Sequence, residues 1–169
     1  MKNYFIFALA FMLNFVVVAQ EEHTKSLDLK KLPSVQLKDM EGNSVDTGKL
    51  GFEGPVVISF WATWCAPCKK ELNAIDELYA DWQEETGVQL VAVSIDDEKT
   101  KNSVPLYVNG KGWEYLVLMD TNGDFKRAMG VNNVPHTFLI DKEGNIVYSH
   151  NNYAPGDEEN LYQEILKIK

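Results

Sequence analysis

The chain has 169 residues, and its 25 acidic and 16 basic side chains give a formal net charge of −9 at pH 7. This excess of acid argues against nucleic acid and anionic membrane surfaces as partners. The length predicts one domain that can bury its own core. The only two cysteines lie three positions apart, so they cannot cross-link distant parts of the fold.

Residues 1–19 have the pattern of a secretory signal peptide. Lys2 supplies a positive charge, an apolar run follows, and Val17 and Ala19 are the small residues expected before a cut after position 19. Cleavage there would remove one lysine and leave a net charge of −10. The alternative is an uncleaved N-terminal anchor, although the apolar run is short for a membrane span.

The residues after this segment divide into a polar leader and a single domain. Residues 20–31 are mostly charged or polar, which predicts a flexible leader, and we expect the domain to span 32–169. From Ser34 apolar and polar residues alternate on both sides of a turn at 39–43, and this pattern predicts a β-hairpin. A loop punctuated by glycines, 48–54, then leads to the first core strand.

The next segments predict a strand, a helix and a second strand. The run 55–60 is apolar and rich in β-branched residues, as is 88–95, so both are expected to be buried strands. Between them apolar residues recur at helical spacing until the stop at Gly87. This β-helix-β order favours parallel pairing through a right-handed crossover, and therefore an α/β fold.

Both cysteines fall where the first core strand ends and the helix begins. A helix N-terminus has unpaired N–H groups and the positive end of the macrodipole, so it favours a thiolate. Pro67 suits a first helical turn because it has no N–H to leave unpaired. We expect Cys65 to be the exposed and more acidic thiol, and Cys68, about one turn later, to be more shielded.

The rest of the chain predicts shorter elements. Residues 97–109 have a helical pattern that Pro105 interrupts, so a short or kinked helix is expected. The acids at 96–98 are interpreted as a helix start rather than a metal site, because no other ligand is near in sequence. The remaining predictions are a strand at 115–119, a helix at 122–129, a hairpin of 137–141 and 146–150, and a C-terminal helix at 157–168.

Two stretches together resemble a known family. The aromatic-flanked run Phe60-Trp61-Ala62-Thr63-Trp64-Cys65-Ala66-Pro67-Cys68-Lys69 and the run from Gly130 to Asp141, with Val-Pro-His-Thr-Phe-Leu-Ile-Asp at its end, are similar to thioredoxin-like thiol-disulfide oxidoreductases of the extracytoplasmic TlpA/ResA type. The similarity covers 32–168. It implies a thioredoxin-like fold, with a central mixed β-sheet flanked by helices and an N-terminal β-hairpin extension.

The resemblance also implies a reaction. Cys65 would attack a substrate disulfide and Cys68 would resolve the mixed disulfide, with no cofactor. The bond Val134–Pro135 would be cis and would turn the backbone of Val134 toward Cys65 to pair with a substrate strand. Trp64 could offer an exposed apolar docking surface.

One departure from the thioredoxin pattern concerns the proton acceptor for Cys68. Thioredoxins keep a buried acid one position before the Phe-Trp pair, and this chain has Ser59 there. In TlpA/ResA-type proteins an acid three residues after the second cysteine is considered for the role, which makes Glu71 the candidate proton relay. The alternative is that Glu71 is an ordinary acid in the first turn of the helix. His136 is expected to be structural or exposed, and His150 belongs to no motif.

We therefore expect an exported enzyme of the periplasm or cell envelope that reduces particular client proteins and is supplied by an upstream membrane electron donor. The direction stays open, because Ala66-Pro67 resembles reducing members whereas Val134 also occurs in oxidising ones. The alternative is a thioredoxin-fold binding module that handles metal or haem-protein clients without disulfide turnover. A metal site would need ligands beyond the two cysteines, and only His23, His136 and His150 are available as histidines.

Overall fold

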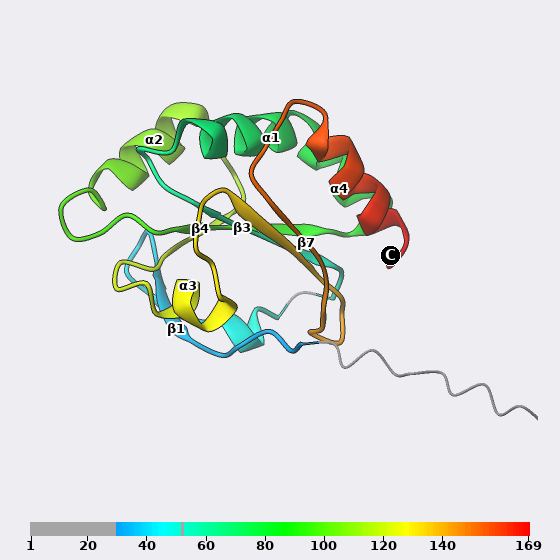
Figure 1. Cartoon of the computed structure of the whole chain (residues 1–169), viewed down its shortest axis with the longest axis horizontal. Coiled ribbons are helices and arrows are strands. Elements are labelled where there is room, and N and C mark those ends of the chain that lie inside the picture. The colour runs from blue at the N-terminus through cyan, green and yellow to red at the C-terminus, as the bar shows by residue number, and fades with distance from the viewer. Residues whose placement is uncertain (1–29, 52) are drawn as a thin grey trace, which may run out of the picture.

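The computed structural model describes residues 30–51 and 53–169, and its centre is a seven-stranded sheet in the order β2-β1-β5-β4-β3-β6-β7 (Figure 1). The strands are β1 Gln36–Asp39, β2 Ser44–Asp46, β3 Val56–Trp61, β4 Gln89–Ser94, β5 Leu116–Met119, β6 His136–Ile140 and β7 Ile146–Asn151. The helices are η1 Thr47–Lys49, α1 Ala66–Thr86, α2 Ser103–Lys111, α3 Asp124–Met129 and α4 Asp157–Leu166. The predicted signal peptide and all but the last two residues of the predicted leader lie outside the described residues.

The sheet is mixed, as predicted. Strands β3, β4 and β5 pair in parallel, whereas β6 and β7 continue the sheet in antiparallel pairs on one side and β1 and β2 on the other. The predicted β3-α1-β4 unit supplies the first parallel pair, and the predicted hairpin β1-β2 extends the sheet by pairing with β5. These findings confirm the thioredoxin-like α/β architecture.

Helices cover both faces of the sheet. Figure 1 shows α1, α2 and α4 on one face and α3 on the other. Two apolar clusters match these layers: one joins α1, α2 and α4 to one face, and the second joins α3 to the opposite face. Because side chains alternate along β3, Trp61 belongs to the first cluster and Phe60 to the second. Ser59 has the same orientation as Trp61 and therefore faces α1.

Helix α2 is short, as predicted for 97–109, but it begins later than the sequence pattern indicates. Residues 98–102 form turns, and α2 begins only at Ser103. Pro105 therefore falls in the first turn, where the missing N–H removes no hydrogen bond within the helix. The sequence pattern placed the helix start too early, so the proline appeared to lie in its interior.

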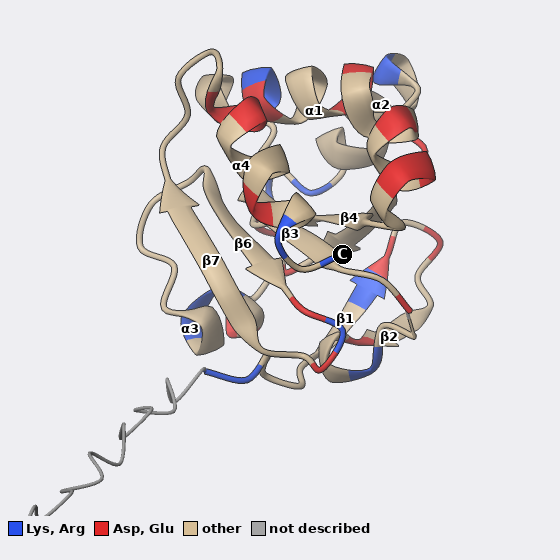
Figure 2. Ribbon diagram, turned by 90° about the vertical axis from the view of Figure 1, so that its right-hand side faces the viewer, with Lys and Arg blue, Asp and Glu red and all other residues tan. Residues whose placement is uncertain are grey.

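The charged residues are unevenly distributed. Figure 2 shows acidic residues gathered on α1 and α4, whereas α2 has no acidic residue and α3 carries Lys126 and Arg127. Across residues 30–51 and 53–169, no helix is both long enough and apolar enough to cross a bilayer.

Candidate active site

The two cysteines form a disulfide at the N-terminus of α1. Their sulfur atoms are 1.96 Å apart, and Cys65 is the residue that caps the helix, with its Sγ accepting a hydrogen bond from the Cys68 N–H at 3.3 Å. Cys65 is 5% exposed and Cys68 is fully buried. The predicted order of accessibility therefore holds, but Cys65 is not an exposed residue in the disulfide form.

The residues around the disulfide differ in exposure. Pro67 lies in the first turn of α1, as expected, and is exposed together with Ala66. Trp64 is 61% exposed, whereas Trp61 is fully buried and packs against Tyr107 and Trp113. Only Trp64 of the two tryptophans beside the dithiol can therefore contact another protein.

The loop that leads into Cys65 is held by a buried acid that the sequence analysis did not select. Asp96 is fully buried and accepts hydrogen bonds from the N–H and the hydroxyl of Thr63, at 2.8 and 2.6 Å, and from the hydroxyl of Ser94. From the other side, Lys69 Nζ donates to the Thr63 carbonyl at 2.9 Å and lies over the Tyr107 ring. Thr63 is thus fixed at both its N–H and its carbonyl.

Asp96 was expected to mark a helix start, and the structure gives it this different role. Asp96 follows a buried strand and precedes two further acids. This pattern fits a helix start as well as a buried hydrogen-bond acceptor, so the sequence alone does not distinguish the two roles. Within residues 30–51 and 53–169 no group of three or more His, Cys, Asp or Glu side chains is arranged to hold a metal ion.

The bond between Val134 and Pro135 is cis, as the resemblance implied. It lies directly before β6, whose first residue, His136, pairs with Phe60 near the end of β3. Because β3 runs on into the loop that carries Cys65, this register brings the proline loop to the same edge of the sheet as the disulfide. Pro135 is buried and Val134 is partly exposed.

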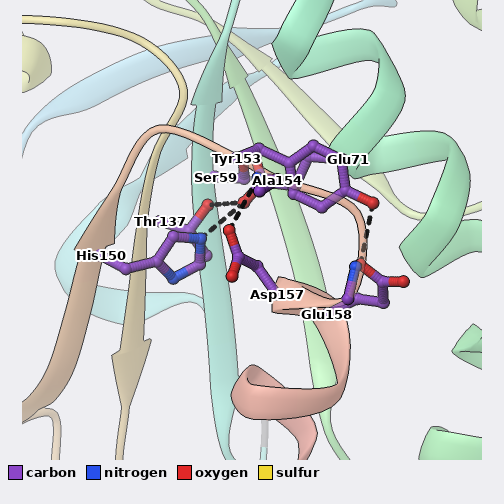
Figure 3. A network of polar contacts seen from close by, with 9 residues as sticks. Ser59, Glu71, Thr137, His150, Tyr153, Ala154, Asp157 and Glu158 are labelled. Atoms are coloured by element: carbon purple, nitrogen blue, oxygen red, sulfur yellow. Dashed lines mark hydrogen bonds and ion pairs between the residues drawn. The ribbon is translucent and has the colours of Figure 1, made fainter.

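Glu71 lies on the buried side of α1, three residues after Cys68, and is 1% exposed. Residues three apart on a helix are neighbours on one face. The carboxylate accepts hydrogen bonds from the hydroxyls of Ser59 at 3.1 Å and Thr137 at 2.8 Å, and its third partner is His150 Nε2 at 3.0 Å (Figure 3). Glu71 is therefore not an exposed first-turn acid.

Ser59 replaces the acid of the thioredoxin pattern, and Glu71 brings a carboxylate to the side chain of Ser59 from α1. The hydroxyl of Ser59, at the position where thioredoxins keep their acid, donates to the Glu71 carboxylate. A buried carboxylate is thus present beside this strand position, although it comes from α1 instead of β3.

His150 is the functional candidate that the sequence did not reveal. It lies on β7, 79 residues after Glu71, and no motif surrounds it. A signal was available in Ser59 and Thr137, which are polar residues inside otherwise apolar buried strands and therefore need polar partners. Nothing in the sequence says which side chain satisfies them.

Comparison with known proteins agrees with this geometry. The chain is 36% identical over 118 residues to the thiol-disulfide oxidoreductase ResA of Bacillus thuringiensis (strain Al Hakam), an alignment that covers 70% of this chain and 66% of that protein. An uncharacterized thioredoxin-like protein from Porphyromonas gingivalis has 51% identity and a TM-score of 0.73, covering 81% of this chain and 90% of that one. A thio-disulfide isomerase from Thermus thermophilus has 28% identity and a TM-score of 0.67, with 83% and 95% covered.

The alignment to ResA spans slightly less than two thirds of that relative, but the match to a family model is wider. The Redoxin model matches residues 28–166, which include the hairpin β1-β2, the disulfide, the cis-proline loop and α4. With a mixed sheet, a C-x-x-C pair at the start of α1 and a cis-proline at the same edge, this chain belongs to the Redoxin family.

Proposed function

We propose that this protein is an extracytoplasmic thiol-disulfide oxidoreductase that reduces disulfides of exported client proteins with Cys65 and Cys68. The observation that carries the proposal is the Cys65–Cys68 disulfide at a helix N-terminus, three residues before the buried Glu71 on the same helix. The predicted signal peptide supports export, and the family supports the reaction class. An upstream membrane dithiol donor would restore the reduced form.

The reaction starts from the reduced dithiol. The Cys65 thiolate attacks one sulfur of a client disulfide, a mixed disulfide forms, and the other client sulfur leaves as a thiolate. The N–H of Cys68, which bonds to Cys65 Sγ in the disulfide form, and the positive end of the α1 dipole stabilise the Cys65 thiolate. Trp64 and the backbone at Val134 provide the docking surface beside it.

The second step releases the client. Cys68 transfers its thiol proton to Glu71, and the resulting thiolate attacks Cys65 Sγ, so that the client leaves as a dithiol and the Cys65–Cys68 disulfide forms. Two electrons pass from the enzyme to the client, and no further cofactor takes part. The buried position of Glu71 suits this role because water has little access to Cys68.

Three measurements test the proposal. The protein should reduce insulin disulfides in the presence of a dithiol donor, and its reduction potential should lie well below ~−120 mV, the range of a strong oxidant. A Cys68→Ser variant should trap a client on Cys65 as a mixed disulfide. Failure to reduce insulin, or co-purification with a metal bound by the two cysteines, would instead favour the binding-module alternative.

The proton-relay role of Glu71 has its own test. In the Glu71→Gln variant the pH profile of Cys68 reactivity should change, because the variant lacks both the proton acceptor and a negative charge that opposes formation of the thiolate. An unchanged profile would show that Glu71 is structural.

A further inference from the structure

Three neighbouring strands contribute one residue each to the surroundings of Glu71. Ser59 on β3 pairs with Thr137 on β6, and Thr137 pairs with His150 on β7, so the three residues form a row across the sheet. All three side chains contact the same carboxylate on α1 (Figure 3). Such a row is set by strand register, and it arranges donors around both carboxylate oxygens.

His150 differs from its two companions because it can change charge. Its Nε2 atom lies 3.0 Å from Glu71 Oε1, the oxygen that also accepts from Thr137, whereas Ser59 donates to Oε2. An ionised carboxylate only accepts hydrogen bonds, so Nε2 carries a hydrogen in both charge states of the ring. The other nitrogen, Nδ1, is buried without a hydrogen-bond partner among the described residues. A positively charged ring therefore requires a hydrogen on Nδ1.

Several other titratable or charged groups face this pair. They are Tyr148 on β7, Tyr153 in the following loop, and Asp157 and Glu158 on α4, whereas His136 on β6 acts from the other face of the sheet and Cys68 precedes Glu71 by three residues on α1. Burial lowers the pKa of His136, and the neighbouring His150 lowers it further. Burial and the hydrogen bond to Glu158 raise the pKa of Tyr153 to about 12, so this tyrosine stays neutral at physiological pH. Of the three described side chains that bond to Glu71, two are hydroxyls, and His150 is the one that can carry a charge.

We propose that His150 is a positioning residue that holds the Glu71 carboxylate beside Cys68 and, through its charge, sets the pH dependence of proton removal from Cys68. When His150 is protonated, the ion pair stabilises the Glu71 carboxylate and makes it a weaker proton acceptor. When His150 is neutral, the hydrogen bond keeps the orientation but the opposing charge is gone. The proton passes from Cys68 Sγ to a Glu71 oxygen and then to solvent, so no other reactant is needed. The inference rests on the proposed function of Glu71.

The test uses the rate at which iodoacetamide alkylates Cys68 in a Cys65→Ala background, measured from pH 5 to 9. We expect the parent profile to contain a second inflection, at lower pH than the inflection of the thiol itself. In His150→Gln the side-chain amide can still donate to Glu71 but does not titrate, so the lower inflection should disappear while the high-pH rate stays within about twofold. Leucine has no donor, so in His150→Leu the Glu71 carboxylate is no longer held in position. The high-pH rate should therefore also fall by about tenfold, which is part of the rate contribution that a positioned base usually makes.

The matched control is His136→Gln, the same change at the other described histidine, which pairs with Phe60 on the opposite face of the sheet and bonds to Asn151 instead of Glu71. This variant should keep the lower inflection. If His150→Gln keeps the parent profile while Glu71→Gln changes it, the inference about His150 is wrong and the role of Glu71 stands. If neither variant changes the profile, the proposed proton relay itself fails. His150→Gln decides the question even if His150→Leu does not fold.

Discussion

Replacement of Glu71 by alanine should destabilise the oxidised protein far more than replacement by glutamine. Alanine leaves the three donors around the carboxylate without their acceptor. A buried polar group that loses its partner costs about 1–3 kcal/mol. The two hydroxyls can rotate toward other acceptors, so we count only one to two donors as left without a partner, which costs roughly 2–4 kcal/mol. Removal of the buried negative charge of Glu71 reduces this cost.

Glutamine preserves most of the network. Its oxygen can accept from Thr137 and His150, and its amide nitrogen can donate to the Ser59 hydroxyl, which also accepts. We therefore expect a cost of about 1 kcal/mol or less for Glu71→Gln, and a gap of at least ~1 kcal/mol between the two variants.

The assay is urea unfolding of the oxidised proteins at pH 7, followed by tryptophan fluorescence and circular dichroism, with the m value compared between variants. Glu77→Ala is the matched control, because Glu77 is an exposed acid on the same helix and its loss should change stability by no more than about 0.5 kcal/mol. If Glu71→Ala and Glu71→Gln unfold at the same urea concentration, the three hydrogen bonds to Glu71 do not contribute to the stability of the oxidised protein.

Three further outcomes follow from the structure. Asp96→Ala should cost roughly 1–3 kcal/mol and speed hydrogen exchange at the Thr63 amide, because that N–H loses its acceptor; unchanged exchange would refute the role of Asp96 in the loop. Burial, Glu114 and Glu77 raise the pKa of Asp76, so the folded state holds the Asp76 proton to a higher pH than the unfolded chain does. Ionised Asp76 therefore lowers stability at neutral pH, and Asp76→Asn should raise the unfolding free energy at pH 7 but not below the ordinary aspartate pKa of 3.8. Trp64→Ala should slow the reduction of insulin but not of a small disulfide, with stability unchanged, because Trp64 is 61% exposed; equal slowing of both substrates would argue against docking.

Most of the elements could be predicted from local patterns. The strands β3 and β4 were recognised from apolar runs, and α1 from helical spacing that ends at Gly87, because burial on a sheet or on one helix face requires these periods. The start of α2 was missed, since a proline in a first turn and one in a helix interior look alike in sequence.

The sequence by itself determined the dithiol at the start of α1 and the α/β order, because these depend on residues close together in the chain, whereas Glu71 was selected through the family resemblance. Only the tertiary structure decided what surrounds Glu71 and what holds Thr63. His150 and Asp96 reach their partners across 79 and 33 residues, through the pairing of β3, β6 and β7 and through the end of β4. Strand register sets which side chains meet, and it results from packing of the whole sheet, so no local pattern in the chain encodes it.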